Sequence, residues 1–219
     1  RRHTRSRQVT GVQTCALPLL MKHSKKICRH LHLPLQSGST KILTAMNRRY
    51  TKEQYLELAE KIRKEIPDIV LRTTLITGFP GETEEDHEEL KEFVDEMEFD
   101  RLGVFTYSPE ENTPAAEMAD QVPEEVKEER RDELMELQQE ISYDRGQDRI
   151  GQELLVMIEG KVADESAYIG RTYGDAPKVD GYIFVQTGEL LMTGDFAKVR
   201  VTGALEYDLI GELADEYTE

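Results

Sequence analysis

The fold is decided by residues 69–107, IVLRTTLITGFPGETEEDHEELKEFVDEMEFDRLGVFTY. Ile69 to Thr77 is rich in leucine and β-branched residues, which is typical of a buried strand. A Gly-Phe-Pro-Gly turn follows, and Thr83 with the acidic residues behind it predicts a helix start. Leu102 to Tyr107 predicts a second strand. The apolar face of the intervening helix is formed by Leu90, Phe93, Val94 and Met97.

The preceding residues repeat this pattern. Ile27 to Leu35 predicts a strand that ends in a polar loop, residues 36–39, and a short helix runs from Thr40 toward Asn47. A second helix begins at Thr51, because Gln54 stands at capping-box spacing. Its apolar stripe comprises Tyr55, Ala59, Ile62 and Ile66. The alternation predicts βαβ units and a parallel sheet, whose ligands bind at the carboxyl ends of the strands.

A different pattern begins near residue 147. Pro123 opens a long acidic helix with Val126, Leu134, Leu137 and Ile141 on one face. Five short strands separated by Gly, Asp and Pro turns then predict an all-β barrel of OB-like size. The expected strands are 154–162, 168–173, 182–186, 196–202 and 206–213.

The charge distribution supports the same division. Residues 1–47 hold nine basic residues and no acid, whereas residues 82–147 hold 24 acidic and 6 basic ones. Residues 148–219 hold 15 acidic and 6 basic residues. We therefore predict an α/β unit over 25–147 and a β-barrel over 148–219, with the boundary at 146–151.

Residues 1–24 show neither helical nor strand periodicity. Two interpretations remain open for this basic stretch: a transit peptide, or a non-native or disordered extension joined to the gene fragment. We favour the extension and leave these residues out of the fold prediction.

Composition excludes several classes of protein. No apolar run approaches the roughly 18 residues that a membrane-spanning helix needs, and two cysteines cannot build a disulfide framework. The net charge of -16 argues against a protein that mainly wraps phosphate backbone, such as a DNA-binding protein. We expect a cytoplasmic protein.

Five segments carry a resemblance to a known family. They are HLHLPLQSGSTKILTAMNRRYT (30–51), RTTLITGFPGETEED (72–86), FDRLGVFTYSPEENTPAA (99–116), YIGRTYGDAPKVDGYIFV (168–185) and EYDLIGEL (206–213). Together they resemble the radical-SAM methylthiotransferases. The resemblance covers residues 25–219 and implies the later part of a TIM-like radical-SAM α/β barrel, followed by a TRAM domain.

Within the family, the last two segments and the acidic helix resemble the branch that modifies ribosomal protein S-twelve. That branch transfers a methylthio group to the β-carbon of an aspartate. The LPLQSGS segment is more similar to the tRNA-modifying branch, which acts on isopentenylated adenosine. A tRNA methylthiotransferase therefore remains an alternative, and so does a non-catalytic ribosome-binding module.

The family needs S-adenosylmethionine and two 4Fe-4S clusters, one of them held by a CxxxCxxC motif. This chain has only Cys15 and Cys28, too few for the thiolate ligands of either cluster. We expect the fragment to bind no cluster, to lack turnover and to contain Cys28 as a buried strand residue. The N-terminal half of the enzyme is expected to be missing.

The matching motifs imply candidate cofactor residues. Polar contacts to S-adenosylmethionine would come from Gln36, Ser37 and Ser39, whereas Gly78, Pro80, Phe105 and Tyr107 would form the wall beside its adenine. Glu82 either bonds the ligand or complements the helix dipole. No catalytic side chain and no metal ligand are predicted.

The histidines and the barrel carboxylates are further candidates for function. His30 and His32 alternate on one strand, but they lack a third metal ligand nearby, and His87 is expected to be solvated. In the acidic barrel, carboxylates should attract a basic ribosomal protein and repel RNA. We predict that Asp175, Asp180, Glu206 and Asp208 contribute to this docking face.

Overall fold

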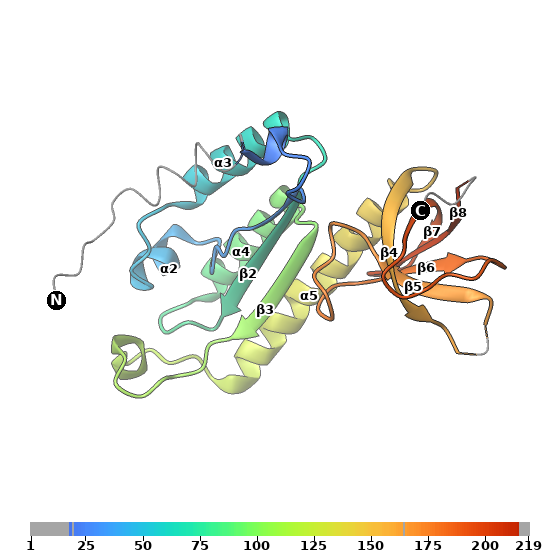
Figure 1. Ribbon diagram of the computed structural model, residues 1–219. Coiled ribbons are helices and arrows are strands. Elements are labelled where there is room, and N and C mark those ends of the chain that lie inside the picture. The colour runs from blue at the N-terminus through green and yellow to red at the C-terminus, as the bar shows by residue number, and fades with distance from the viewer. Residues whose placement is uncertain (1–17, 19, 164, 215–219) are drawn as a thin grey trace, which may run out of the picture.

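The computed structural model describes residues 18, 20–163 and 165–214. Figure 1 shows an α/β unit joined by one long helix to a small β-barrel. The α/β unit contains β1 (His30–His32), α2 (Thr40–Ala45), α3 (Lys52–Glu65), β2 (Val70–Thr77), α4 (Glu84–Met97), β3 (Arg101–Thr106), the 3-10 helix η1 (Pro114–Glu117) and α5 (Glu124–Gln147). The predicted order of strands and helices is confirmed.

The sheet has three parallel strands in the order β1-β2-β3. His32 pairs with Arg72, and Arg72 pairs with Arg101, so three basic side chains lie in one row across the strands. β1 is shorter than the strand predicted at 27–35. Pro34 has no amide hydrogen to donate, and Gln36 returns to the sheet only as an isolated bridge to Leu75.

Helices α3 and α4 begin where the sequence predicts. Thr51 caps α3 and Thr83 caps α4, and each forms a reciprocal capping box with the residue three positions later. These bonds satisfy backbone amides that the first helical turn leaves without partners. The chain direction into both helices is thereby fixed.

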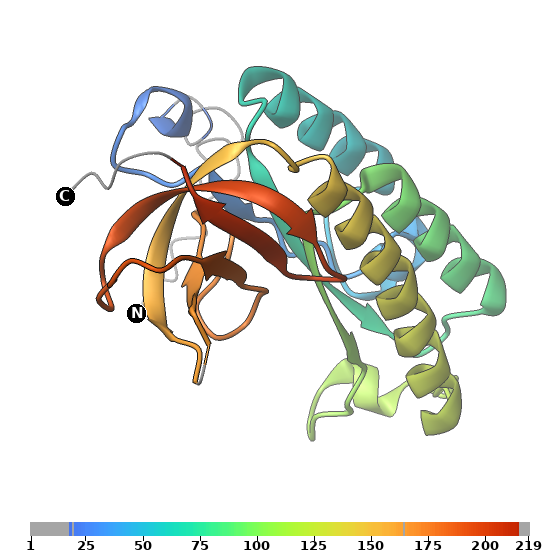
Figure 2. The same ribbon diagram turned by 90° about the vertical axis from the view of Figure 1, so that its right-hand side faces the viewer.

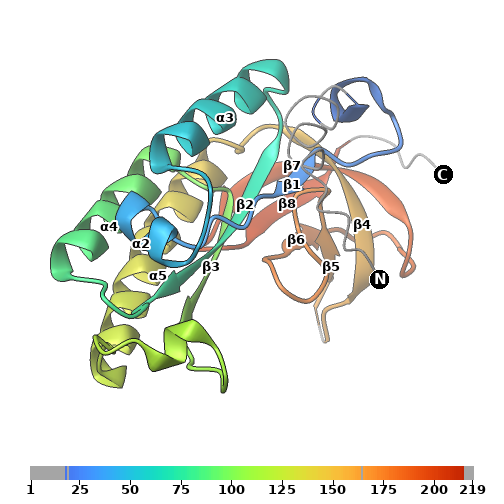
Figure 3. The ribbon, with the colours of Figure 1, turned by 90° about the vertical axis from the view of Figure 1, so that its left-hand side faces the viewer.

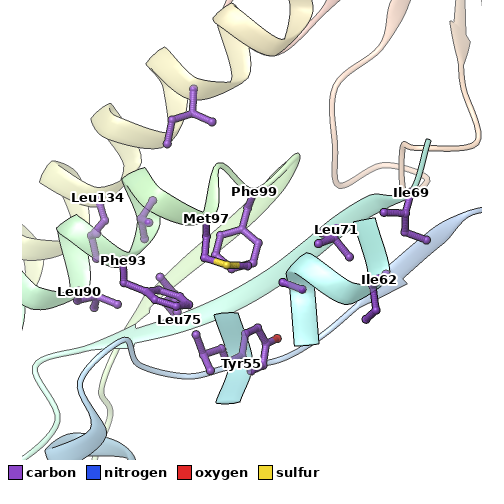
Figure 4. Close-up of a cluster of buried hydrophobic side chains, with 14 of the residues drawn as sticks. Tyr55, Ile62, Ile69, Leu71, Leu75, Leu90, Phe93, Met97, Phe99 and Leu134 are labelled. Carbon is purple, nitrogen blue, oxygen red and sulfur yellow. The ribbon is translucent and has the colours of Figure 1, made fainter. Parts of the chain in front are cut away.

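The core of the α/β unit lies between the sheet and its helices. Phe93 of α4 lies close to both Tyr55 of α3 and Phe99 (Figure 4), with ring-centroid distances of 6.4 and 6.0 Å. Leu71 and Leu75 of β2 are fully buried on the same side. Every apolar residue predicted for α4 is buried, namely Leu90, Phe93, Val94 and Met97.

The opposite face of the sheet carries no helix of the described chain. In Figures 2 and 3, helices α3, α4 and α5 lie to one side of the sheet and the barrel lies to the other. Alternation along β2 places Arg72, Thr74 and Ile76 on this second face, and all three are only partly buried. We call it the open face.

The second unit is a closed barrel with strand order β4-β5-β6-β8-β7. Its strands are β4 (Glu153–Lys161), β5 (Ala167–Arg171), β6 (Ile183–Gln186), β7 (Phe196–Ala204) and β8 (Leu209–Leu213). Val156, Ile158, Ile183, Val185 and Val199 are completely buried inside it. The predicted five-stranded barrel is confirmed.

Several expectations for single residues are corrected. Cys28 is exposed, because β1 begins only at His30. His87 is fully buried against α5, where its Nε2 lies 3.1 Å from a carboxylate oxygen of Glu133. Of the segment expected to be non-native, residues 1–17 and 19 lie outside the described chain, but Met21 is 2% exposed and joins the α/β core.

Candidate functional site

The carboxyl edge of the sheet brings Gln36, Gly78 and Tyr107 close together. The amide of Ile76 donates to the Gln36 carbonyl at 2.8 Å, and the amide of Tyr107 donates to the Thr77 carbonyl at 2.8 Å. Gln36 and Gly78 both have positive φ angles, 80° and 70°. The chain therefore turns sharply at Gln36 and Gly78, at the carboxyl edge of the sheet, where parallel sheets bind their ligands.

Ser37 and Ser39 point into the protein instead of toward this edge. Both are 1% exposed. The hydroxyl of Ser39 donates to Asp86 Oδ1 at 2.9 Å, and the Ser37 hydroxyl accepts the Ser39 amide at 3.2 Å. These bonds hold the loop to α4, so the expectation of direct ligand contacts from the two hydroxyls is corrected.

Asp86 is the centre of that attachment. Burial alone would raise the pKa of its carboxyl group, but bonds from Lys41, the Thr83 backbone and the Ser39 hydroxyl outweigh burial and lower the pKa. Lys41 Nζ lies 2.5 Å from Asp86 Oδ2. A charged Asp86 thus ties the loop after β1 to the start of α4.

Gly78 and Pro80 form the buried loop that follows β2. A side chain cannot be added at Gly78 without displacement, because a Cβ there would lie 2.2 Å from Lys127 Cγ. Pro80 is buried as well. Both residues lie at the predicted edge of the site, but both are buried, and Lys127 of α5 packs against Gly78.

Phe105 and Tyr107 have different environments. Phe105 is 62% exposed and lies on the open face, in register with Ile76. Tyr107 packs on Phe79 with a centroid distance of 5.2 Å, and Lys127 Nζ lies 5.6 Å from its ring. Phe105 is thus the aromatic surface available to a ligand, whereas Tyr107 supports the edge.

Glu82 has a function that the sequence did not reveal. Its Oε1 accepts the Gly78 amide at 2.9 Å and a bond from Arg130 Nη1 at 2.9 Å, while its Oε2 is buried and has no partner among the described residues. Burial raises the pKa of this carboxyl group, against the opposing influence of Gly78 and Arg130. The residue joins the loop after β2 to α5.

Lys127 and Arg130 were missed because they lie in a helix that otherwise appears acidic and solvated. They are 4% and 6% exposed. Lys127 Nζ donates to the Tyr107 carbonyl at 2.9 Å, so α5 holds the ends of both β2 and β3. The detectable signal was two cations at i and i+3 spacing among many carboxylates.

The four acids predicted to form a docking face do not share one surface. Asp175 and Asp180 are buried, with side chains 5% and 7% exposed, in ion pairs with Arg101 and Arg72. Asp208 accepts the Tyr182 amide at 2.7 Å. Only Glu206 is freely exposed. The prediction is corrected for Asp175 and Asp180, because the α/β unit covers them.

The described residues offer no cluster-binding site. No group of three or more His, Cys, Asp or Glu side chains within them could hold a metal ion. His32 bonds Thr74 at 3.1 Å, and burial followed by Arg72 lowers the pKa of its imidazole. Two cysteines do not fit the thiolate set of a 4Fe-4S cluster.

In the part of the chain that the structure describes, no helix is long and apolar enough to cross a membrane.

A groove of about 750 Å³ follows the free edge of β1. Its apolar lining includes Leu31, Leu33, Tyr50, Tyr55, Leu58 and Ile62. Apolar surface is therefore accessible along this edge, as expected for a sheet with an unpaired edge strand.

Comparison with known proteins identifies both units. Residues 9–94 match the Radical SAM superfamily, and residues 150–214 match the TRAM domain. The chain combines a radical SAM region with a TRAM domain. The predicted fold class, a partial radical-SAM barrel followed by an OB-like TRAM barrel, is thereby confirmed.

Curated relatives extend over both units. The chain is 58% identical over 192 residues to the ribosomal protein uS12 methylthiotransferase RimO of Lachnoclostridium phytofermentans, covering 88% of this chain and 44% of the relative. It is 51% identical over 200 residues to the RimO protein of Desulfitobacterium hafniense, covering 91% of this chain and 45% of the relative. It is 54% identical over 194 residues to that of Pelotomaculum thermopropionicum, covering 88% of this chain and 44% of the relative. The chain spans less than half the length of these relatives. The resemblance to RimO-type radical-SAM methylthiotransferases, a family of enzymes, is confirmed.

Proposed function

We propose that this chain forms part of a radical-SAM enzyme that transfers a methylthio group to ribosomal protein uS12. The observation that carries the proposal is the 58% identity to a RimO protein across both the α/β unit and the barrel. The substrate atom inferred from the resemblance is the β-carbon of an aspartate. Because ribosomal proteins are the substrate, we also infer a cytoplasmic location.

The α/β unit would supply one wall of the S-adenosylmethionine site. When bound, S-adenosylmethionine supplies the radical that removes a hydrogen atom from the substrate carbon. Exposed Phe105 can bury an apolar ring, and the loop beginning at Gln36 offers backbone and amide groups to polar atoms. Lys127 and Arg130 would not touch the ligand but would fix the loops around it.

Cluster chemistry lies outside the capacity of this chain. Cys28 is exposed and belongs to no group of three potential metal ligands within the described residues. We expect no methylthiolation of uS12 by the purified 219-residue protein, even after reconstitution with iron and sulfide. Mass spectrometry of uS12 peptides measures this directly, and a modified aspartate would overturn the expectation.

The barrel would contribute the surface that recruits substrate. Residues 148–219 carry 15 acidic and 6 basic side chains, so their field attracts a basic protein and repels a phosphate backbone. With Asp175 and Asp180 buried, this attraction depends on the remaining carboxylates, of which Glu206 is an exposed example. Electrostatic attraction of this kind mainly raises the association rate.

Binding of the purified chain to uS12 and to tRNA tests the substrate class. We expect isothermal titration calorimetry to show binding to uS12 that weakens with added salt, and weaker or no binding to tRNA. A second basic ribosomal protein serves as the control for charge alone. Tighter binding to tRNA would instead favour the tRNA methylthiotransferase, which the LPLQSGS segment at 33–39 also resembles.

A further inference from the structure

The loop Thr172–Asp180 of the barrel contacts the open face of the α/β sheet. Asp175 Oδ2 accepts the Thr172 amide at 3.0 Å and its hydroxyl at 2.6 Å. Asp180 Oδ2 accepts the Ala176 amide at 2.8 Å. One oxygen of each carboxylate therefore closes the loop on itself, which leaves the second oxygen available to another part of the molecule.

The second oxygens bind the sheet. Asp175 Oδ1 lies 2.5 Å from Arg101 Nη2, and Asp180 Oδ1 lies 2.5 Å from Arg72 Nη1. Arg72 and Arg101 are register partners on neighbouring strands, so the two guanidinium groups form adjacent attachment points. Their side chains are 15% and 16% exposed, which places both ion pairs largely away from solvent.

Close backbone approach accompanies the ion pairs. The Tyr173 hydroxyl donates to the Asp68 carbonyl at 2.7 Å, just before β2. A Cβ added to Gly174 would lie 3.0 Å from Val70 Cγ2. The loop thus meets the sheet through two ion pairs, one hydrogen bond and tight packing, and removing one charged partner while the contact stays closed would leave the other buried and unpaired.

We propose that Asp175 and Asp180 are positioning residues that clamp the TRAM barrel in one orientation on the open face of the sheet. Arg72 and Arg101 lie toward the amino ends of β2 and β3, whereas exposed Phe105 lies farther along β3 on the same face. A partner held by the barrel would consequently be presented at a fixed place relative to Phe105. This consequence for substrate rests on the proposed function, but the clamp itself does not.

Distance measurements between spin labels test the clamp in the 219-residue protein. One label is attached at Glu96→Cys on α4 and one at Leu190→Cys on the barrel, both exposed positions, after Cys15 and Cys28 are replaced by serine. The labelled protein that retains Asp175 and Asp180 should give one narrow distribution of distances between the two labels. Asp180→Asn retains an oxygen for the Ala176 amide but loses its charge, and we expect the narrow peak to become the minor population.

A mutant cycle separates the clamp from a role within the loop. If Asp180 acts through Arg72, Asp180→Asn should add no broadening to a protein that already carries Arg72→Gln. The same relation is expected for Asp175→Asn and Arg101→Gln. Glu206→Arg, an exposed charge change on the same barrel, is the control and should leave the narrow peak unchanged.

Two results would overturn the proposal. One is a narrow distribution in the combined Asp175→Asn and Asp180→Asn protein, and the other is full additivity in the cycle. If a variant unfolds the barrel, far-ultraviolet circular dichroism reveals a loss of strand structure, which contradicts a role restricted to orientation. If a variant still binds uS12 but its distance distribution becomes broad, the proposed function is unaffected. If the protein fails to bind uS12 but its distance distribution stays narrow, the clamp is unaffected.

Discussion

Lys127 packs so tightly on Gly78 that a Cβ at residue 78 would lie 2.2 Å from Lys127 Cγ. The same lysine donates to the Tyr107 carbonyl at 2.9 Å. One side chain of α5 thus holds the loops that follow β2 and β3. Because α5 continues directly into the barrel, the helix joins the carboxyl edge of the sheet to the second unit.

Replacing Gly78 by alanine should destabilise the protein more than replacing Gly81. Both glycines have positive φ angles, 70° and 82°, so either alanine bears a backbone cost of about 1 kcal/mol. Gly81 has open space around it, whereas Gly78 faces Lys127. Urea denaturation should therefore show an additional loss of about 1 to 3 kcal/mol for Gly78→Ala.

The excess loss is expected to depend on Lys127. In a Lys127→Ala background the contacts with Cγ and Cδ are removed and only the Cβ contact at 3.1 Å remains, so the difference in free energy of unfolding between Gly78→Ala and Gly81→Ala should become much smaller. Equal losses already in the unchanged background would contradict the contact between Lys127 and Gly78.

Phe105 should contribute to S-adenosylmethionine affinity without contributing much to stability. We suggest a chimera in which residues 25–214 replace the matching part of RimO from Lachnoclostridium phytofermentans. Loss of one exposed aromatic surface, Phe105→Ala, should weaken binding by about 1 kcal/mol, roughly fivefold. Equilibrium dialysis measures the affinity.

Phe196→Ala provides the matched control for this change. Phe196 is 52% exposed but lies on β7 of the barrel, away from the sheet. It should leave S-adenosylmethionine affinity unchanged. Equal weakening by both substitutions would argue against a ligand wall at Phe105.

Asp86 should make stability depend on acid pH. The pKa of its carboxyl group is lowered in the folded protein, so its contribution is complete above the ordinary value of about 4 and is lost as the pH falls through the folded value. Asp86→Asn should cost about 2 kcal/mol at pH 7 and progressively less below pH 4. Urea denaturation at several pH values measures the difference, which should nearly vanish at the lowest pH.

Glu85→Gln is the companion experiment. Glu85 lies in the same helical turn, but its side chain is exposed. A small effect at every pH is expected, because exposed carboxylates are screened by solvent. A loss equal to that of Asp86→Asn would assign the pH dependence to the helix dipole instead of to Asp86.

Elements with strong periodicity could be predicted from the sequence. The Thr51 and Thr83 capping boxes and the apolar stripe of α4 determine two helices locally, and strand alternation with turn residues gave the barrel. Local patterns were sufficient to predict these elements, because each of them packs a single apolar face against one hydrophobic core. The carboxyl edge followed from the strand order alone.

Buried charges could not be predicted in this way. Lys127 and Arg130 occupy positions on α5 where a core helix usually has apolar residues. Their partners in the loops of the sheet, Tyr107 and Glu82, lie 20 and 48 residues away in sequence. Asp175 and Asp180 were predicted to contribute to a docking face for the same reason, although both pair with arginines of the sheet. Their burial depends on ion pairs with Arg72 and Arg101, which are distant in sequence, so the local sequence pattern does not reveal it.

Turnover by the chimera is the most direct test of the central claim. The chimera receives its cluster ligands from the relative and residues 25–214 from this chain. We predict that it methylthiolates uS12 and not tRNA, with the modified aspartate identified by tandem mass spectrometry. A folded chimera that binds both clusters and S-adenosylmethionine but modifies only tRNA, or neither substrate, would contradict the proposed function.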